Sequence, residues 1–227
     1  MTGRRGDVHG QPSVHDGTDM RLTILGATGR IGSLALDAAG RAGHPTVALV
    51  RVMPESLPAG VRAVVGSIED REAIRRAITG TDAVLAALGP RTNSAAAAAE
   101  LARGMRNLVE AMGAERVERL VALSGAAVDV PGDRKPLLDR VASRIVNVAT
   151  RHVVAAKQRE FEIFGASPLA WTALRPPIVT DGSARGYRLS DQLQPGARVT
   201  RADVAQALID VMDDQSSVRR APFVLPR

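Results

Sequence analysis

A glycine-rich stretch near the N-terminus, Thr23–Gly32 (TILGATGRIG), constrains the fold of this chain more than any other feature. An apolar run ends at Leu25, and a helical pattern begins directly after the glycines. Gly26 permits a tight turn, Gly29 lets the backbone approach a pyrophosphate, and Gly32 lets the helix pack against the strand. The start of the helix offers free N–H groups to an anion. This strand–turn–helix context predicts a dinucleotide site rather than a plain glycine-rich turn.

The rest of the chain alternates apolar strands with helices. Strands are predicted over 21–25, 46–50, 61–65, 83–87, 120–123 and 171–174, with a further edge strand over 222–225. Helices are predicted over 30–42, 69–78, 94–112, 137–164 and 201–212, the third capped by Asn93 or Ser94. Strands that are apolar throughout are buried on both faces, and intervening helices imply right-handed crossovers. We therefore expect an α/β fold: a single-domain, Rossmann-type doubly wound parallel sheet with helices on both faces.

Composition limits the classes of protein that this chain can belong to. The 227 residues contain no cysteine, which excludes disulfides and thiolate chemistry. No apolar run approaches the roughly 20 residues that span a bilayer, so we expect a cytoplasmic protein without a membrane partner. The net charge of +6 comes almost entirely from arginine, and no nucleic-acid-binding or metal-ligand spacing accompanies it. This charge reflects either arginine-rich codon usage or attraction of anionic ligands.

The chain is expected to divide into two parts. Residues 1–19 lack periodicity and are interpreted as a disordered tail. Residues 20–227 are expected to form one dinucleotide-binding domain, with substrate-pocket elements in about 125–151 and 176–200.

The residue after the second predicted strand indicates which dinucleotide binds. An acidic side chain there would hydrogen-bond the ribose hydroxyls of NAD, but this chain carries Arg51. A guanidinium suits a phosphate, and Arg30 on the first helical turn could add a second cation. These arginines favour NADP(H); the alternative is that Arg51 is a solvated loop residue.

The order and spacing of several segments resemble the atypical short-chain dehydrogenase/reductase family. The most similar group is the NAD(P)H-binding flavin reductase/biliverdin reductase B type, with NmrA-like proteins as neighbours. The resemblance runs from about 20 to 225 through the segments GATGRIG, LVR, AALGPR, ALSGAA, HVVAAK, ALRPPIVTDG and RVTRADVAQAL.

The resemblance implies a role for each matching position. The residues expected to hold the pyrophosphate and nearby ribose are Gly26, Thr28, Gly29, Arg30 and Ile31, with Gly32 closing the turn. Arg51 would bind the 2′-phosphate, Ser67 and Ile68 would flank the adenine, and Leu88, Gly89 and Arg91 would line the groove. Ser124 would face the nicotinamide, and Pro176, Pro177 and Ile178 would pack beside its carboxamide. The family usually has aspartate at Ser67, histidine at Ile178 and a second basic residue in the loop after Arg51, so substrate identity stays open.

The catalytic group differs from that of ordinary members of the superfamily. They use serine with a Tyr-x-x-x-Lys pair, but the residue four before Lys157 is Val153, and the sole tyrosine is Tyr187. Either Tyr187 enters the site from the side or no phenol acid is used, in which case water supplies the proton. The predicted catalytic residues are Ser124, Lys157 and Tyr187; alternatively Ser124 caps a turn and Lys157 is solvated.

The predicted function is an NADPH-dependent oxidoreductase acting on a small planar or carbonyl acceptor such as a flavin, quinone or ketone. The alternatives are a non-catalytic NADP-sensing NmrA-like regulator and a biosynthetic tailoring ketoreductase or cyclase. The expected partner is a small-molecule substrate, and the expected assembly is a monomer or homodimer.

Overall fold

The computed structural model of the protein describes residues 19–131, 133 and 151–227. The main strands are β1 (Leu22–Leu25), β2 (Thr46–Val50), β3 (Val61–Val65), β4 (Ala83–Ala86), β5 (Arg119–Leu123) and β6 (Ala170–Leu174). They form one parallel sheet in the order β3-β2-β1-β4-β5-β6. Strand order reverses beside β1, which is the position where doubly wound sheets bind their ligands.

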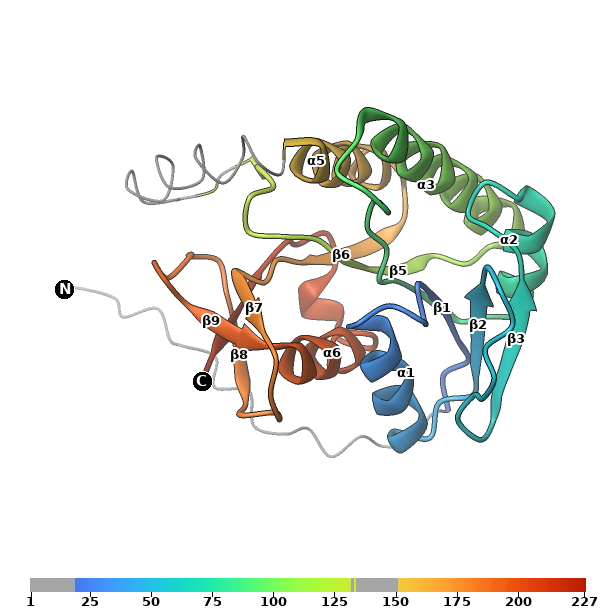
Figure 1. Ribbon diagram of the computed structural model, residues 1–227, viewed down its shortest axis with the longest axis horizontal. Coiled ribbons are helices and arrows are strands. Elements are labelled where there is room, and N and C mark those ends of the chain that lie inside the picture. The colour runs from blue at the N-terminus through green and yellow to red at the C-terminus, as the bar shows by residue number, and fades with distance from the viewer. Residues whose placement is uncertain (1–18, 132, 134–150) are drawn as a thin grey trace.

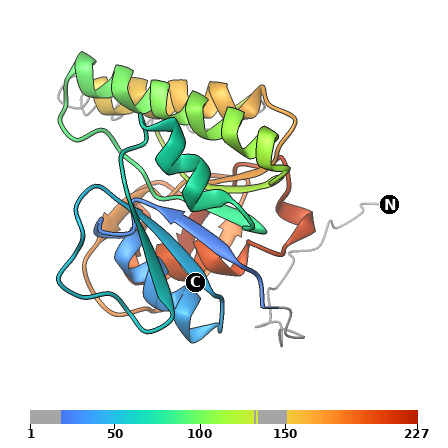
Figure 2. The same cartoon turned by 90° about the vertical axis from the view of Figure 1, so that its right-hand side faces the viewer.

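Helices cover both faces of the sheet (Figure 1, Figure 2). They are α1 (Gly32–Arg41), α2 (Arg71–Ile78), α3 (Ala95–Glu115), α5 (Arg151–Gly165), α6 (Arg201–Asp210) and the short 3-10 helix η1 (Gln215–Ser217). Helices α1 and α6 share one buried cluster with Leu22, Ile24 and other strand residues. Helices α2, α3 and α5 share a second cluster with Leu25, Val84 and their neighbours. Alternate residues of each strand therefore enter opposite cores, as the uniformly apolar strands predict.

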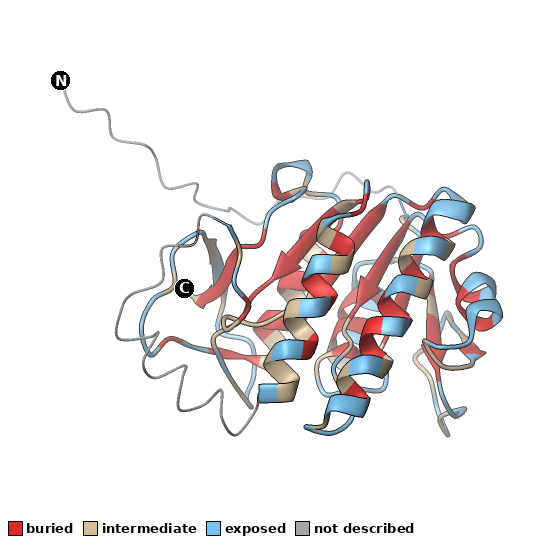
Figure 3. Ribbon diagram, turned by 90° about the horizontal axis from the view of Figure 1, so that it is seen from above, coloured by how far each residue is buried: buried red, intermediate tan, exposed pale blue. Residues whose placement is uncertain are grey.

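The outer helices show why a helical period was visible in the sequence. Figure 3 shows α3 and α5 with exposed outer faces and buried faces against the sheet. In α3 the buried residues include Leu101, Met105, Leu108 and Met112. Ser94 is the N-cap, since its Oγ accepts a hydrogen bond from the Ala97 N–H at 3.2 Å.

The predicted Rossmann-type parallel sheet with helices on both faces is confirmed, with element ends shifted by up to three residues. Three predicted segments are only partly described, because residues 1–18 of the tail, 137–150 of the fourth helix, and 132 and 134–150 of the pocket element over 125–151 lie outside the described residues. No helix in the described part of the chain is long and apolar enough to cross a membrane.

In addition to the predicted edge strand, the C-terminal part contains three short strands that the sequence did not indicate. Strand β7 (Ile178–Thr180) pairs with β9 (Arg198–Thr200), and β8 (Tyr187–Ser190) pairs with β10 (Phe223–Pro226). The predicted edge strand over 222–225 is thus β10, and its main partner is β8 in a separate two-stranded sheet. These strands have three or four residues each, too few for a period to be read.

The strands of the main sheet end together at one edge. Leu25 of β1 lies opposite Leu49 of β2 and Ala86 of β4, and Val50 lies opposite Val65 of β3. The loops that follow these strands consequently meet at this edge, where they form the candidate site.

Candidate functional site

The turn after β1 has the geometry of a phosphate cradle. Gly26 has a φ of +81°, and an added Cβ would lie 2.4 Å from the Ala87 carbonyl oxygen. The Gly29 N–H donates to the Gly26 carbonyl at 2.9 Å. A Cβ on Gly32 would lie 2.0 Å from that same oxygen, so α1 can begin there only with glycine. Its N-cap residue, Ile31, makes no side-chain capping bond, which leaves the N-terminus of α1 available to an anion.

A cleft of about 230 Å³ opens beside this turn, between the ends of β1 to β4 and α3. Its wall includes most of the residues expected to contact the cofactor: Gly26, Thr28, Gly29, Arg51, Ser67, Ile68, Leu88, Gly89 and Arg91. These positions span more than sixty residues of sequence, and the shared edge of the sheet brings them together. Eight further wall residues were not among the predicted site residues, namely Leu25, Leu49, Gly66, Ala87, Pro90, Ala97, Glu100 and Leu101.

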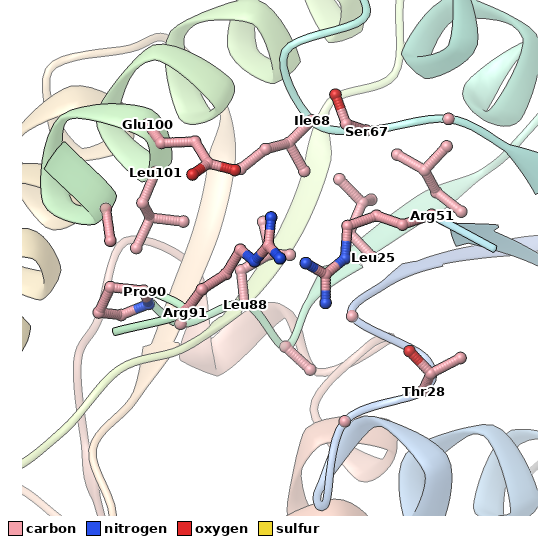
Figure 4. A pocket seen from close by; sticks show the side chains of 17 residues that line it. Leu25, Thr28, Arg51, Ser67, Ile68, Leu88, Pro90, Arg91, Glu100 and Leu101 are labelled. Atoms are coloured by element: carbon pink, nitrogen blue, oxygen red, sulfur yellow. The ribbon is translucent and has the colours of Figure 1, made fainter. Parts of the chain in front are cut away.

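Two arginines give this first cleft its charge. Arg51 follows β2 and Arg91 lies in the loop after β4, and Figure 4 shows both guanidinium groups pointing toward the centre of the cleft. No hydrogen bond or ion pair joins either guanidinium to another described residue. Arg30, the other candidate cation, lines a neighbouring cleft instead.

This second cleft continues the first toward β5. It shares Gly29, Leu88 and Gly89 with the first cleft and reaches Leu123 at the end of β5. Arg201, at the start of α6, also lines it and forms an ion pair with Asp181. The two clefts together form a groove that crosses the carboxyl edge of the sheet on both sides of the glycine turn. A dinucleotide has the same layout, with a pyrophosphate between two nucleosides.

Lys157 occupies a buried position between the two strands that end at the groove. Its Nζ donates to the carbonyl oxygens of Leu88 at 2.5 Å and Leu123 at 2.6 Å, and to Glu160 Oε2 at 2.7 Å. The Lys157 side chain is 12% exposed and that of Glu160 is 2% exposed. An ammonium has three N–H donors, so all three are engaged and none is left for a ribose hydroxyl in this arrangement. Burial raises the pKa of Glu160, and Lys157 partly opposes that rise.

Ser124 directly follows β5, and its hydroxyl has no partner among the described residues. Its backbone N–H donates to the Leu174 carbonyl at 2.8 Å, which holds the turn beside the end of β6. The Oγ is buried and makes no hydrogen bond within residues 19–131, 133 and 151–227. A buried hydroxyl without a partner is unfavourable, so such groups in native proteins are expected to have a ligand or a function.

The wall expected beside the carboxamide follows β6 and is held by Arg175. This buried guanidinium forms a bidentate ion pair with Asp133, in which Nη1 and Nη2 donate to Oδ2 and Oδ1 at 2.6 Å and 2.7 Å. It also lies 3.9 Å from the centre of the Phe223 ring. Pro176 is buried, Pro177 half-buried and Ile178 exposed. None of these three residues lines either of the two clefts described above.

Tyr187 lies in β8, and its hydroxyl donates to Asp210 Oδ2 at 2.5 Å. Burial, together with Asp210, raises the pKa of the phenol above its ordinary value, which makes it a weaker acid. The ring packs against the core cluster of α1 and α6 and lines neither cleft. The structure therefore does not bring Tyr187 together with the groove residues.

The fold and the groove define a dinucleotide-binding protein of the Rossmann type. The chain belongs to the NAD(P)H-binding family, whose sequence profile matches residues 26–215. This match confirms the resemblance to NAD(P)H-binding reductases that the motifs indicated.

Individual proteins that resemble this chain share only a short aligned segment or a low sequence identity with it. Phenylcoumaran benzylic ether reductase POP1 from Populus trichocarpa is 34% identical over 80 residues, which is 30% of this chain and 26% of the relative. The chain thus aligns with about a quarter of the length of that curated relative. ChuY, an anaerobilin reductase from Escherichia coli O157:H7, has a similar fold, with a TM-score of 0.75, 17% identity and coverage of 91% and 97% of the two chains. A short-chain dehydrogenase/reductase from Veillonella parvula in complex with NADP has a TM-score of 0.71, 20% identity and coverage of 90% and 94%.

Proposed function

We propose that this protein is an NADPH-dependent reductase that transfers hydride to a small planar or carbonyl acceptor, such as a flavin, quinone or ketone. The observation that carries the proposal is the pair of arginines, Arg51 and Arg91, that line the glycine-lined groove and have no partner among the described residues. Two cations without carboxylate partners suit the extra phosphate of NADP. The NADP complex of the Veillonella parvula protein and the reductase names of the relatives support this assignment.

Different residues along the groove would bind different parts of the cofactor and the acceptor. The glycine turn and the start of α1 bind the pyrophosphate, and Arg51 and Arg91 bind the 2′-phosphate. The nicotinamide, when bound, supplies hydride chemistry to an acceptor stacked on it. Ser124, with its unpartnered hydroxyl, donates a hydrogen bond to the acceptor oxygen or to the carboxamide. Lys157 acts as a positioning residue, because it ties the carbonyls of Leu88 and Leu123 on the two sides of the second cleft.

A non-catalytic NADP-binding protein is the second candidate. It is favoured by one observation: the hydroxyl of Tyr187 and the ammonium of Lys157 are both engaged by other protein groups. If the protein is a reductase, neither Tyr187 nor Lys157 supplies the proton, and the proton comes from water. Such a reaction suits flavins and quinones better than simple ketones.

An acceptor assay separates these functions. NADPH oxidation is followed with FMN, a quinone and a simple ketone, for the unmodified protein and for Ser124→Ala. We expect turnover with at least one acceptor. The loss of one hydrogen bond to the acceptor should lower kcat/KM about tenfold in the variant. The affinity for NADPH should be almost unchanged if the hydroxyl contacts the acceptor.

Two outcomes of this assay would contradict parts of the proposal. Tight NADPH binding without turnover of any acceptor would favour the non-catalytic candidate over a reductase. Turnover that is identical in Ser124→Ala would leave the reductase in place but remove Ser124 from its chemistry.

A further inference from the structure

Glu100 is the one acidic residue among the described residues that line the first cleft. It lies near the start of α3 and is half-buried. Figure 4 shows its carboxylate pointing from the helix toward Ile68, on the side of the cleft away from Thr28 and the glycine turn. A carboxylate in a cleft that otherwise attracts anions requires an explanation.

The Glu100 carboxylate has no protein partner in the part of the chain that the structure describes. The nearest basic residue along α3, Arg103, pairs with Glu69 at 2.7 Å. The other polar side chain at this end of the cleft is the neutral Ser67, whose Oγ accepts the Glu69 N–H at 3.2 Å. Among the described residues at this end of the cleft, Glu100 is therefore the one charged acceptor open to a ligand.

The surroundings of Glu100 form a slot for a flat apolar ring. Ile68, Leu88 and Leu101 line this part of the cleft. Ile68 is held tightly against α3, since a Cβ on Gly104 would lie 2.3 Å from Ile68 Cδ1. Gly104 is one helical turn beyond Glu100, and residues four apart share a helix face. The Ile68 side chain thus packs against the face of α3 that carries Glu100.

We propose that Glu100 reads the exocyclic amino group of the adenine in the dinucleotide, and so selects adenine over purines with an oxygen at that position. This inference rests on the proposed binding of NADPH in the groove. A carboxylate only accepts hydrogen bonds, whereas the adenine amino group only donates them in the plane of the ring. In hypoxanthine a carbonyl oxygen replaces the amino group, so two acceptors would face each other. Specificity then arises from attraction to one base and repulsion of the other.

The test compares NADPH with its deamino analogue, reduced nicotinamide hypoxanthine dinucleotide phosphate, by calorimetric titration. We expect the unmodified protein to bind the analogue at least about tenfold more weakly, as for loss of one hydrogen bond to a charged group at a half-exposed site. Glu100→Gln should bring the two dissociation constants to within about twofold, because an amide can present either its oxygen or its NH2 group. Glu110→Gln makes the same change on the exposed face of α3, where Glu110 pairs with Arg71, and should leave the ratio unaltered.

Each contrary outcome has a distinct meaning. Equal affinity of the unmodified protein for the two nucleotides would overturn the role of Glu100 and leave the proposed function in place. Tighter binding of both nucleotides by Glu100→Gln, with their ratio unchanged, would also overturn it, because the carboxylate would then face the phosphate. Failure of both nucleotides to bind would overturn the proposed function, and this inference with it.

Discussion

Gly32→Ala is expected to lower the melting temperature of the protein and to abolish measurable NADPH binding. The added Cβ would lie 2.0 Å from the Gly26 carbonyl oxygen, which is a backbone atom and cannot rotate away. Overpacking of this kind costs about 3 kcal/mol. In a domain of this size that corresponds to a fall of about 6–12 °C. The turn must shift to relieve the contact, and the shift moves the N–H groups that would bind the pyrophosphate.

Gly40→Ala is the matched control for this prediction. Gly40 lies in the same helix α1, is exposed, and a Cβ there would meet nothing within 4 Å. Alanine in a helix interior is favoured over glycine by about 0.5–1 kcal/mol. The control should therefore be slightly stabilised and should bind NADPH normally. Thermal unfolding with and without NADPH measures both effects, and equal behaviour of the two variants would refute the close approach at Gly32.

Lys157→Met is expected to be the most destabilising change beside the groove. It leaves the buried Glu160 carboxylate without its cation and the carbonyls of Leu88 and Leu123 without their donor. Breaking a buried pair by removal of one partner costs about 3–5 kcal/mol. The ends of β4 and β5 should also separate, so we expect weaker NADPH binding in addition to the lower melting temperature.

The loss of stability in Lys157→Met should depend on pH because of the Glu160 carboxylate. Burial raises the pKa of Glu160, and removal of Lys157 takes away the two interactions that lower it, so the pKa rises further. The folded state then keeps a proton that the unfolded state releases near about pH 4.3. Stability is consequently lost as the pH rises from there through the folded-state pKa.

Denaturant unfolding of Lys157→Met across this pH range tests the effect. The deficit relative to the unmodified protein should be small at about pH 4 and larger at about pH 8. Adding Glu160→Gln to the variant removes the titrating group and should flatten the profile. A deficit that is the same at all pH values would contradict the account of Glu160 as a buried carboxylate dependent on Lys157.

The sequence was informative where local chemistry decides the structure. Uniformly apolar strands predicted the buried parallel sheet, and Ser94 had the residue type and position of an N-cap. The glycines of the first turn predicted a close approach, which the structure shows between Gly32 and Gly26. Because parallel strands end at one edge, the positions of Arg51 and Arg91 at a common cleft also followed from the order of strands and helices.

The rest depended on contacts between residues far apart in the chain. The i,i+3 spacing of Lys157 and Glu160 is visible in the sequence, but their burial is not, and Lys157 meets a carbonyl 69 residues away. Likewise, nothing near Tyr187 indicates that Asp210 would engage its hydroxyl. The orientation of Glu100 depends on the rotation of α3, which the contact between Gly104 and Ile68 constrains.

Binding of NADPH through Arg51 is tested most directly by calorimetric titration of the unmodified protein and of Arg51→Glu with NADPH and NADH. We expect the unmodified protein to bind NADPH about tenfold to a hundredfold more tightly than NADH, because Arg51 adds a charge-assisted contact to the 2′-phosphate. Arg51→Glu should weaken NADPH far more than NADH. Equal affinity of the unmodified protein for both nucleotides, an equal effect of Arg51→Glu on both, or the absence of binding by either would contradict NADPH binding through Arg51.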